Sequence, residues 1–302
     1  MDELARLKEL LTRHAGEGLT PTALPGVSIQ CSRTTTERVG AITEPTVAVI
    51  AQGAKETALN GRIFAYGAGH FVITSLELPV VGHIVEAKAE EPFLAFVLRL
   101  RPDKIAALLL ETAPAPTIRR GAADAMATGI AVSQASRALL DAVGRLLALL
   151  DSPGDALALA DGIEREVLWR LVTGPQGATV RQIGLADSGL AHLGHAIRHI
   201  RSNYDKALRV EVLAGLATMS VSSFHRHFRG VTSMTPIQFQ KQVRLQEARV
   251  RLLAEPADVA GVGFAVGYDS PSQFSREYRR MFGLPPSRDA LAMREAALLP
   301  SS

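Results

Sequence analysis

The chain has 302 residues, of which 47% are hydrophobic and 21% are charged, so it is long enough for about two domains and can bury a sizeable core. Its single cysteine, Cys31, excludes a disulfide framework and a cysteine-rich zinc site. The N-terminus lacks the apolar centre of a signal peptide, and no run approaches the roughly 18 apolar residues of a membrane helix. These features predict a cytoplasmic protein with no membrane partner.

The charged residues are distributed unevenly. Residues 1–192 carry 18 Lys and Arg against 21 Asp and Glu, whereas residues 193–302 carry 15 against 9. The first part is therefore mildly acidic and the last third is basic. This asymmetry indicates either an anionic partner for the last third or a solvated basic surface.

The first hundred residues have two kinds of pattern. Residues 1–16 are typical of a short amphipathic helix, and short runs rich in Val, Ile and Phe follow between Leu24 and Arg101. Asn60-Gly61 joins two of these runs with the residues of a tight hairpin turn. Many short strands at this spacing predict a β-sandwich or a small barrel.

The middle of the chain changes to helical periodicity. The Ala-, Pro- and Gly-rich residues 113–134 are predicted to be irregular. Residues 139–150 then place leucines on one helical face, and a second helix is predicted over about 161–173. These helices pack either on the strands or against a second subunit. Residues 184–192 are predicted to link two domains.

The last third contains a repeat at a constant offset of 50 residues. SVSSFHRHFRGVTSMTP (220–236) aligns with SPSQFSREYRRMFGLPP (270–286). The matched pairs are Ser220 with Ser270, Ser222 with Ser272, Phe224 with Phe274, Arg226 with Arg276, Phe228 with Tyr278, Arg229 with Arg279, and Pro236 with Pro286. So many matches at one offset indicate two copies of one unit.

Each copy has a predicted buried face and a predicted exposed face when it is drawn as a helix. The buried faces carry Val221, Phe224 and Phe228 in the first copy, and Pro271, Phe274 and Tyr278 in the second. The exposed faces carry Ser222, Arg226 and Arg229 with His225 alongside, and Ser272, Arg276 and Arg279 with Ser275 alongside.

A short helix and a tight turn precede each copy, over 213–220 and 262–270. Ser220 and Ser270 are good N-caps, Ala214 and Gly263 allow two helices to cross closely, and Gly267 suits a turn with positive φ. This is the layout of a helix-turn-helix, whose second helix enters the major groove of DNA. A linking helix of about 18 residues would span ~27 Å, against ~34 Å between successive major-groove faces.

These residues resemble the AraC/XylS family of bacterial transcription regulators. The similarity lies in MSVSSFHRHFRGVTSMTPIQFQKQVRLQEARVRLL and VGYDSPSQFSREYRRMFGLPP and covers about 193–295. It implies base-facing positions at Ser222, His225 and Arg226 and at Ser272, Ser275 and Arg276. Four basic residues are predicted phosphate contacts or solvated charges, namely Arg229, Arg279, Arg280 and Lys241.

Residues 20–110 resemble the cupin-like N-terminal domain of one branch of that family. The resemblance implies a barrel that binds a small-molecule effector, followed by helices that form a dimer interface. We therefore predict an α+β protein: a cupin-like β-barrel with accessory helices (1–110), a helical dimerisation region (111–183), the linker, and an all-α DNA-binding domain (193–295). Its two helix-turn-helix units are joined by a long helix.

The predicted function is a sequence-specific DNA-binding transcription regulator, expected to be an activator, that responds to the effector. Promoter DNA, the effector, a second copy of the chain and RNA polymerase are the candidate partners. An alternative is a non-specific architectural DNA-binding protein. Another is a cupin-type metal-dependent enzyme, although His70 and His83 do not form the HxH pair that such a metal site commonly uses.

Two smaller features have a functional and a structural interpretation. His192, His195 and His199 share one helical face and either bind a metal or form the polar side of a core helix. Cys31 is either a reactive sensor or a small core residue. In both cases the structural interpretation is favoured, and no metal, cofactor or catalytic residue is predicted.

Overall fold

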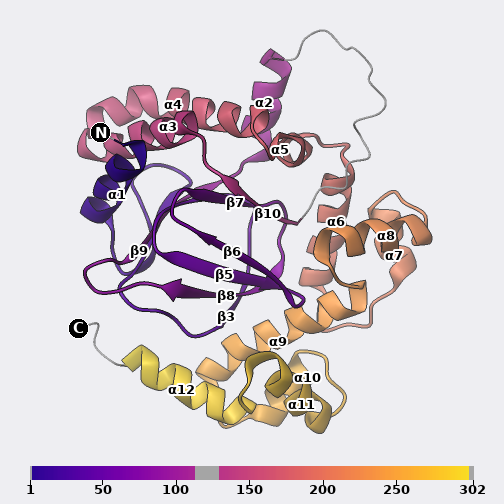
Figure 1. The fold of residues 1–302 in the computed structure, drawn as a ribbon. Coiled ribbons are helices and arrows are strands. Elements are labelled where there is room, and N and C mark those ends of the chain that lie inside the picture. Colours follow the sequence, from indigo (N-terminus) through magenta and orange to yellow (C-terminus); the bar gives the residue numbers. More distant parts are fainter. Residues whose placement is uncertain (1, 113–128, 299–302) are drawn as a thin grey trace.

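The strands of the protein pair into two antiparallel sheets in a computed structural model that describes residues 2–112 and 129–298 (Figure 1). The six-stranded sheet has the order β1 (Gly18–Pro21), β2 (Val27–Ser32), β9 (Phe93–Arg99), β4 (Thr46–Gln52), β7 (His70–Thr74) and β10 (Ile130–Gln134). The four-stranded sheet has the order β3 (Val39–Ile42), β8 (Pro79–Glu86), β5 (Ala54–Leu59) and β6 (Arg62–Gly67).

The predicted α+β class is confirmed, but the described strands do not close into a barrel. The chain passes from β4 to β5, and so from one sheet to the other, at Gly53, which has a φ of +75°. A Cβ atom there would lie 2.4 Å from the carbonyl oxygen of Glu86, so only glycine fits. This sharp corner separates the two sheets, and the result is a sandwich.

The hairpin predicted at Asn60-Gly61 is confirmed, because both residues have positive φ, 49° and 83°, between the paired ends of β5 and β6. The prediction that residues 113–134 are irregular is wrong for the last of them. Residues 113–128 lie outside the described residues, but β10 pairs with β7 at the sheet edge. The sheet region therefore continues past the predicted boundary at residue 110.

Helices cover one side of the six-stranded sheet. They are α1 (Glu3–His14), α2 (Pro102–Thr112), α3 (Arg137–Ala148), the short 3-10 helix η1 (Leu149–Asp151), α4 (Pro153–Thr173) and α5 (Gly177–Gly184). The predicted leucine face of α3 is buried within this chain, with Val143 and Leu147 fully covered. Helix α4 starts at Pro153 rather than near residue 161, since proline is tolerated in the first helical turn.

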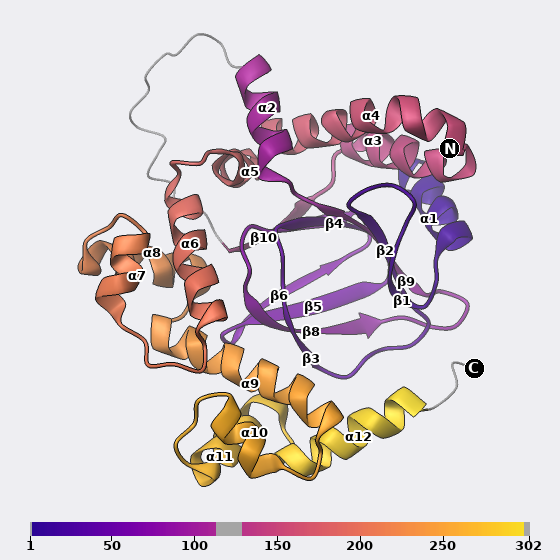
Figure 2. The same ribbon diagram turned by 180° about the vertical axis from the view of Figure 1, so that it is seen from behind.

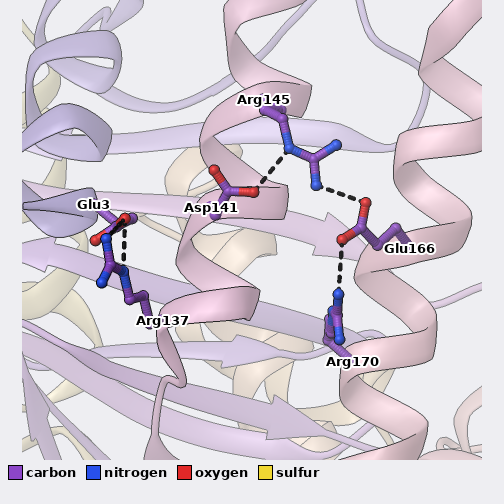
Figure 3. A network of polar contacts seen from close by, with 6 residues as sticks. All are labelled: Glu3, Arg137, Asp141, Arg145, Glu166 and Arg170. Atoms are coloured by element: carbon purple, nitrogen blue, oxygen red, sulfur yellow. Dashed lines mark hydrogen bonds and ion pairs between the residues drawn. The ribbon is translucent and has the colours of Figure 1, made fainter.

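A network of ion pairs ties α1, α3 and α4 together (Figure 3). Arg145 of α3 donates to Asp141 on its own helix at 2.9 Å and to Glu166 on α4 at 2.6 Å. Arg137 of α3 donates to Glu3 of α1 at 2.8 Å. These pairs are partly exposed, so each contributes little to the stability of the fold.

The C-terminal part is entirely helical in the described residues. Its helices are α6 (Gly189–Ser202), α7 (Val210–Leu216), α8 (Val221–Thr232), α9 (Pro236–Ala254), α10 (Val259–Ala265), α11 (Pro271–Phe282) and α12 (Pro286–Leu298). Helices α8 and α11 keep the offset of 50 at both ends. The predicted linker 184–192 is too long, because Ser188 caps α6 by accepting from the Ala191 amide. No described helix combines the length and the apolarity needed to cross a membrane.

Helix α9 belongs to two hydrophobic cores. Phe239 and Val243 in its first half pack in the large core that the sheets share with α6, α7 and α8. Leu245, Ala248 and Leu252 in its second half pack in a smaller core with α10, α11 and α12. Figures 1 and 2 place α9 between the four-stranded sheet and these last three helices. One helix therefore holds both helix-turn-helix units.

A buried carboxylate connects α9 to α11. Glu277 of α11 accepts from Lys241 of α9 at 2.9 Å, from Gln273 at 3.1 Å and from the Tyr268 hydroxyl at 2.9 Å. Burial of Glu277 favours the neutral acid, but these three donors favour the carboxylate more strongly, so the pKa of Glu277 is lowered.

We expect Glu277→Gln to destabilise this domain by about 2 kcal/mol near neutral pH, because charge-assisted hydrogen bonds contribute about that much. Because the pKa of Glu277 is lower in the folded protein, its carboxylate stabilises the fold at pH values above the ordinary pKa of 4.5. This contribution is lost as the pH falls through the lower pKa of the folded state. Thermal unfolding of both proteins from pH 7 to pH 3 should show the difference shrinking at acid pH. A stability difference between the two proteins that stays constant from pH 7 to pH 3 contradicts a stabilising role for the Glu277 carboxylate.

Candidate nucleic-acid interface

The two helix-turn-helix units are built alike around their turns. Thr218 and Gly267 hold equivalent places, with φ of +52° and +89°, and each amide donates to a carbonyl three residues earlier. The helices before the turns are offset by 49 residues and the helices after them by 50, so the second unit has one extra residue before its cap. A Cβ atom on Gly267 would lie 2.3 Å from the Asp205 carbonyl, which confirms the predicted need for glycine.

The N-caps and the close helix crossing also follow the prediction. Ser220 accepts from the Ser223 amide at 3.3 Å, and Ser270 accepts from the Gln273 amide at 3.4 Å. A Cβ atom on Gly263 would lie 3.0 Å from a ring carbon of Phe274, so α10 and α11 cross with almost no space between them.

The predicted buried faces are correct at the aromatic residues and wrong at the helix starts. Phe224, Phe228, Phe274 and Tyr278 are fully buried. Val221, however, is 40% exposed, and Pro271 is exposed as well. Both occupy the first helical position, where the side chain lies beyond the preceding helix that covers the rest of the face.

The predicted outward residues are at the surface in both units. Ser222, Arg226 and Arg229 on α8 are exposed, and so are Ser272, Arg276 and Arg279 on α11. His225 and Ser275 are half-buried beside them. The structure thus brings these eight residues onto two matched helix faces.

The arginine side chains of these faces have no partner within the part of the chain that the structure describes. Among the described residues, none lies within hydrogen-bonding or ion-pairing distance of the guanidinium groups of Arg226, Arg229, Arg276 and Arg279. A guanidinium group in this state is free to pair with a guanine edge or a phosphate. The two faces therefore present unneutralised positive charge to solvent.

Other basic residues of the domain are used internally. Arg249 makes a two-pronged ion pair with Asp289 at 2.8 and 3.0 Å, and Arg244 donates to the carbonyl oxygens of Tyr204 and Gly267 at 2.6 Å each. Lys241, which sequence predicts to be a phosphate contact or a solvated charge, is instead paired with Glu277. The sequence could not reveal this contact because its two residues lie 36 positions apart.

The histidines of α6 form the polar side of a core helix. Leu193, Ile197 and Ile200 are buried on the opposite face. His192 is hydrogen-bonded to Thr218 at 3.0 Å. Among residues 2–112 and 129–298, no three His, Cys, Asp or Glu side chains are grouped so that they could hold a metal ion.

Cys31 lies in β2, opposite Leu94 of β9, and is 2% exposed. Burial raises the pKa of its thiol. Such a thiol forms little of the reactive thiolate, which argues against the sensor role.

A cavity of about 610 Å³ lies between the two sheets. Its walls include Gln30, Thr74 and Val97 from the six-stranded sheet and Lys55 and Tyr66 from the four-stranded sheet. Sequence reasoning missed these residues, because a cavity depends on how two sheets face each other. The only signal in the sequence is a lysine at an inward position of a short strand.

Comparison with known proteins matches both halves of the chain to family models. The model of the AraC-type transcriptional regulator N-terminus matches residues 23–179, and a helix-turn-helix domain model matches residues 213–290.

Curated relatives are similar over the C-terminal part. The transcriptional activator RhaS of Escherichia fergusonii is 30% identical over 108 residues, which is 36% of this chain and 38% of RhaS. The transcriptional activator RclR of Escherichia coli is 34% identical over 105 residues, which is 35% of this chain and 37% of RclR. The matches thus span little more than a third of either relative.

The fold is also found in a solved structure that is matched over nearly all of its chain. Apo ToxT from Vibrio cholerae, in a lysine-to-alanine variant, superposes with a TM-score of 0.53 at 9% identity, over 90% of this chain and 99% of ToxT. At that identity the comparison shows a shared fold alone. The first family model, however, covers half of the chain, so this protein belongs to the AraC-type transcriptional regulators.

Proposed function

We propose that the protein is a sequence-specific DNA-binding transcription regulator, an activator, whose two-sheet region binds a small-molecule effector. The observation that carries this proposal is the pair of matched helices α8 and α11, each with an exposed serine and with arginine side chains that have no partner among the described residues. An arginine paired with guanine would read sequence, and its neighbours on the same face would contact phosphates. Such a protein acts on the chromosome in the cytoplasm.

The spacing of the two units supports binding to one face of a duplex. Helix α9 has 19 residues and therefore spans about 28 Å. Successive major-groove faces are about 34 Å apart. Because α9 is packed in both cores, it would hold the two reading helices at a fixed separation.

The inter-sheet cavity supports an effector site. It lies in the part of the chain that matches the regulatory family model. ToxT, which shares the fold, has been solved with an unsaturated fatty acid bound. We infer that the effector of this protein occupies the cavity between the sheets.

The cavity and the DNA-binding helices share a wall. Val39 and Ala41 of β3 line the cavity, while Gly40 between them contacts α9 and α11. A Cβ atom on Gly40 would lie 3.2 Å from Phe282 and 3.3 Å from Gln246. An effector that moves β3 would therefore also move α9.

The contact between β8 and α9 leaves a buried polar atom without a partner. Gln246 of α9 donates to the Val80 carbonyl at 3.1 Å, but its side-chain oxygen is buried and accepts no hydrogen bond from the described residues. Exposing that oxygen to water recovers a penalty of about 1–3 kcal/mol. This weakness suits an interface that opens and closes in response to an effector.

A homodimer and contact with RNA polymerase are further parts of the proposal, and both rest on family resemblance. The leucine face of α3 is covered within one chain, so a dimer would use another surface. We propose that this surface lies in the helical region 111–183, and that residues 193–295 act on DNA.

We expect Arg226→Ala to weaken binding to the preferred DNA sequence by about 1–3 kcal/mol and to relax discrimination at one base pair. A duplex selected from a random library serves as the target. Arg6→Ala, on the exposed face of α1, is the matched control and should change nothing.

Footprinting and titration at several salt concentrations measure both effects. Affinity should fall steeply with salt, because counterions are released from the phosphates. Equal affinity for selected and random duplexes would favour an architectural DNA-binding protein instead.

We expect Gly40→Leu to disrupt the shared wall, because the added side chain meets α9 and Phe282. Gly162→Leu is its control, since a Cβ atom there has nothing within 4 Å. Amide hydrogen exchange in β3 and α9 should rise in the first variant only, with DNA affinity changing by the several-fold that is usual for linked sites. Unchanged exchange in α9 rules out this docking contact.

A further inference from the structure

The side chain of Lys55 crosses the cavity from one sheet toward the other. Lys55 lies on β5 of the four-stranded sheet, and its Nζ donates to the Gln30 side chain, on β2 of the six-stranded sheet, at 3.1 Å. Gly82 on the neighbouring β8 lies beside it: a Cβ atom there would be in van der Waals contact with Cε of Lys55, at 3.5 Å. The amine is thus held inside the cavity rather than directed to solvent.

Among the described residues, Lys55 lacks the anionic partner that several other partly buried cations have. Lys104 is paired with Glu164, Lys241 with Glu277 and Arg249 with Asp289. In the described residues, no carboxylate oxygen lies within the 4.0 Å ion-pair limit of the Lys55 amine. A covered ammonium group without a counter-ion is destabilising, so an anion from outside the chain would stabilise it.

The carboxylate that lines the cavity is already engaged elsewhere. Glu44 is half-exposed at the rim and pairs with Arg99 at 2.7 Å. Glu56, the neighbour of Lys55 on β5, lies 3.6 Å from His83 and is not part of the cavity lining. The amine therefore faces a cavity that provides hydrogen-bond acceptors but no neutralising charge.

The rest of the cavity is suited to a molecule with an apolar body. The hydroxyl groups of Thr57 and Tyr66 are hydrogen-bonded at 2.7 Å on the wall that carries Lys55. Apolar side chains form much of the remaining lining, namely those of Val72, Val80, Ile84, Val97 and Ile130. A lining that combines a cation and hydroxyl groups with many apolar side chains matches an amphipathic ligand.

We propose that the effector is an organic anion, a carboxylate with an apolar body, and that Lys55 is its counter-ion. This inference rests on the proposed effector site. A carboxylate at Nζ would replace the missing ion pair with charge-assisted hydrogen bonds. The apolar body would be buried between the sheets.

Matched acids and amides test the inference, because each pair differs in charge but hardly in shape. Decanoate is compared with decanamide, and 4-phenylbutyrate with 4-phenylbutanamide, by calorimetric titration of the full chain. We expect at least one acid to bind about tenfold more tightly than its amide, the usual effect of a charge-assisted contact. Equal binding of acids and amides, or no binding by either acid, overturns the proposal.

Two substitutions identify the amine that is responsible. Lys55→Met should abolish the preference for the acid, while Lys88→Met, at an exposed lysine outside this cavity, should retain it. Since Lys55→Met removes an unpaired covered charge, its Tm should equal or exceed that of the parent, which controls for misfolding. An acid preference that survives in Lys55→Met also overturns the proposal.

DNA binding by the same preparations separates this inference from the proposed function. Selective DNA binding without an acid preference would leave the regulator in place and remove the anionic effector. Acid binding without selective DNA binding would support the anionic effector and remove the proposed regulator function.

Discussion

The packing of α9 is the constraint on which the rest of the structure depends. Its first half is buried with Phe228 of the first helix-turn-helix, whose ring lies 5.5 Å from that of Phe239, and its second half is buried with α10, α11 and α12. Neither half is covered without its partners, so the two units cannot separate without exposing a core. The same helix lies on β3 and β8, the strands that form one wall of the cavity. A displacement of that wall therefore reaches both units at once.

The basic residues divide into two groups that their residue type does not distinguish. Arg249 and Lys241 are neutralised inside the domain by Asp289 and Glu277, and Arg244 is held by backbone carbonyl oxygens, so all three hold α9 against its neighbours. Arg226 and Arg276 occupy equivalent positions on the reading helices and have no such partner among the described residues. The net positive charge of the last third is thus concentrated where a phosphate backbone would meet it.

Local features of the sequence predicted most of the C-terminal fold. The serine caps, the aromatic pairs and the turn glycine act within a few residues of each other, so the repeat revealed them. The prediction was wrong at Val221 and Pro271, where burial depends on the end of a neighbouring helix rather than on periodicity. It was also wrong for Lys241, whose partner Glu277 is placed by tertiary packing. In the N-terminal part, strand runs and the Asn60-Gly61 hairpin were visible, but β10, the corner at Gly53 and the cavity around Lys55 arise from how distant strands pair.

We propose that DNA binding and the cavity wall are linked through α9. The most direct test is amide hydrogen exchange of the full chain, free and bound to a duplex selected from a random library. We expect DNA to change exchange in β3 and β8, which contact α9, and to leave exchange in β1, at the outer edge of the other sheet, unchanged. Protection confined to α8 and α11, with β3 and β8 unaffected, would contradict it.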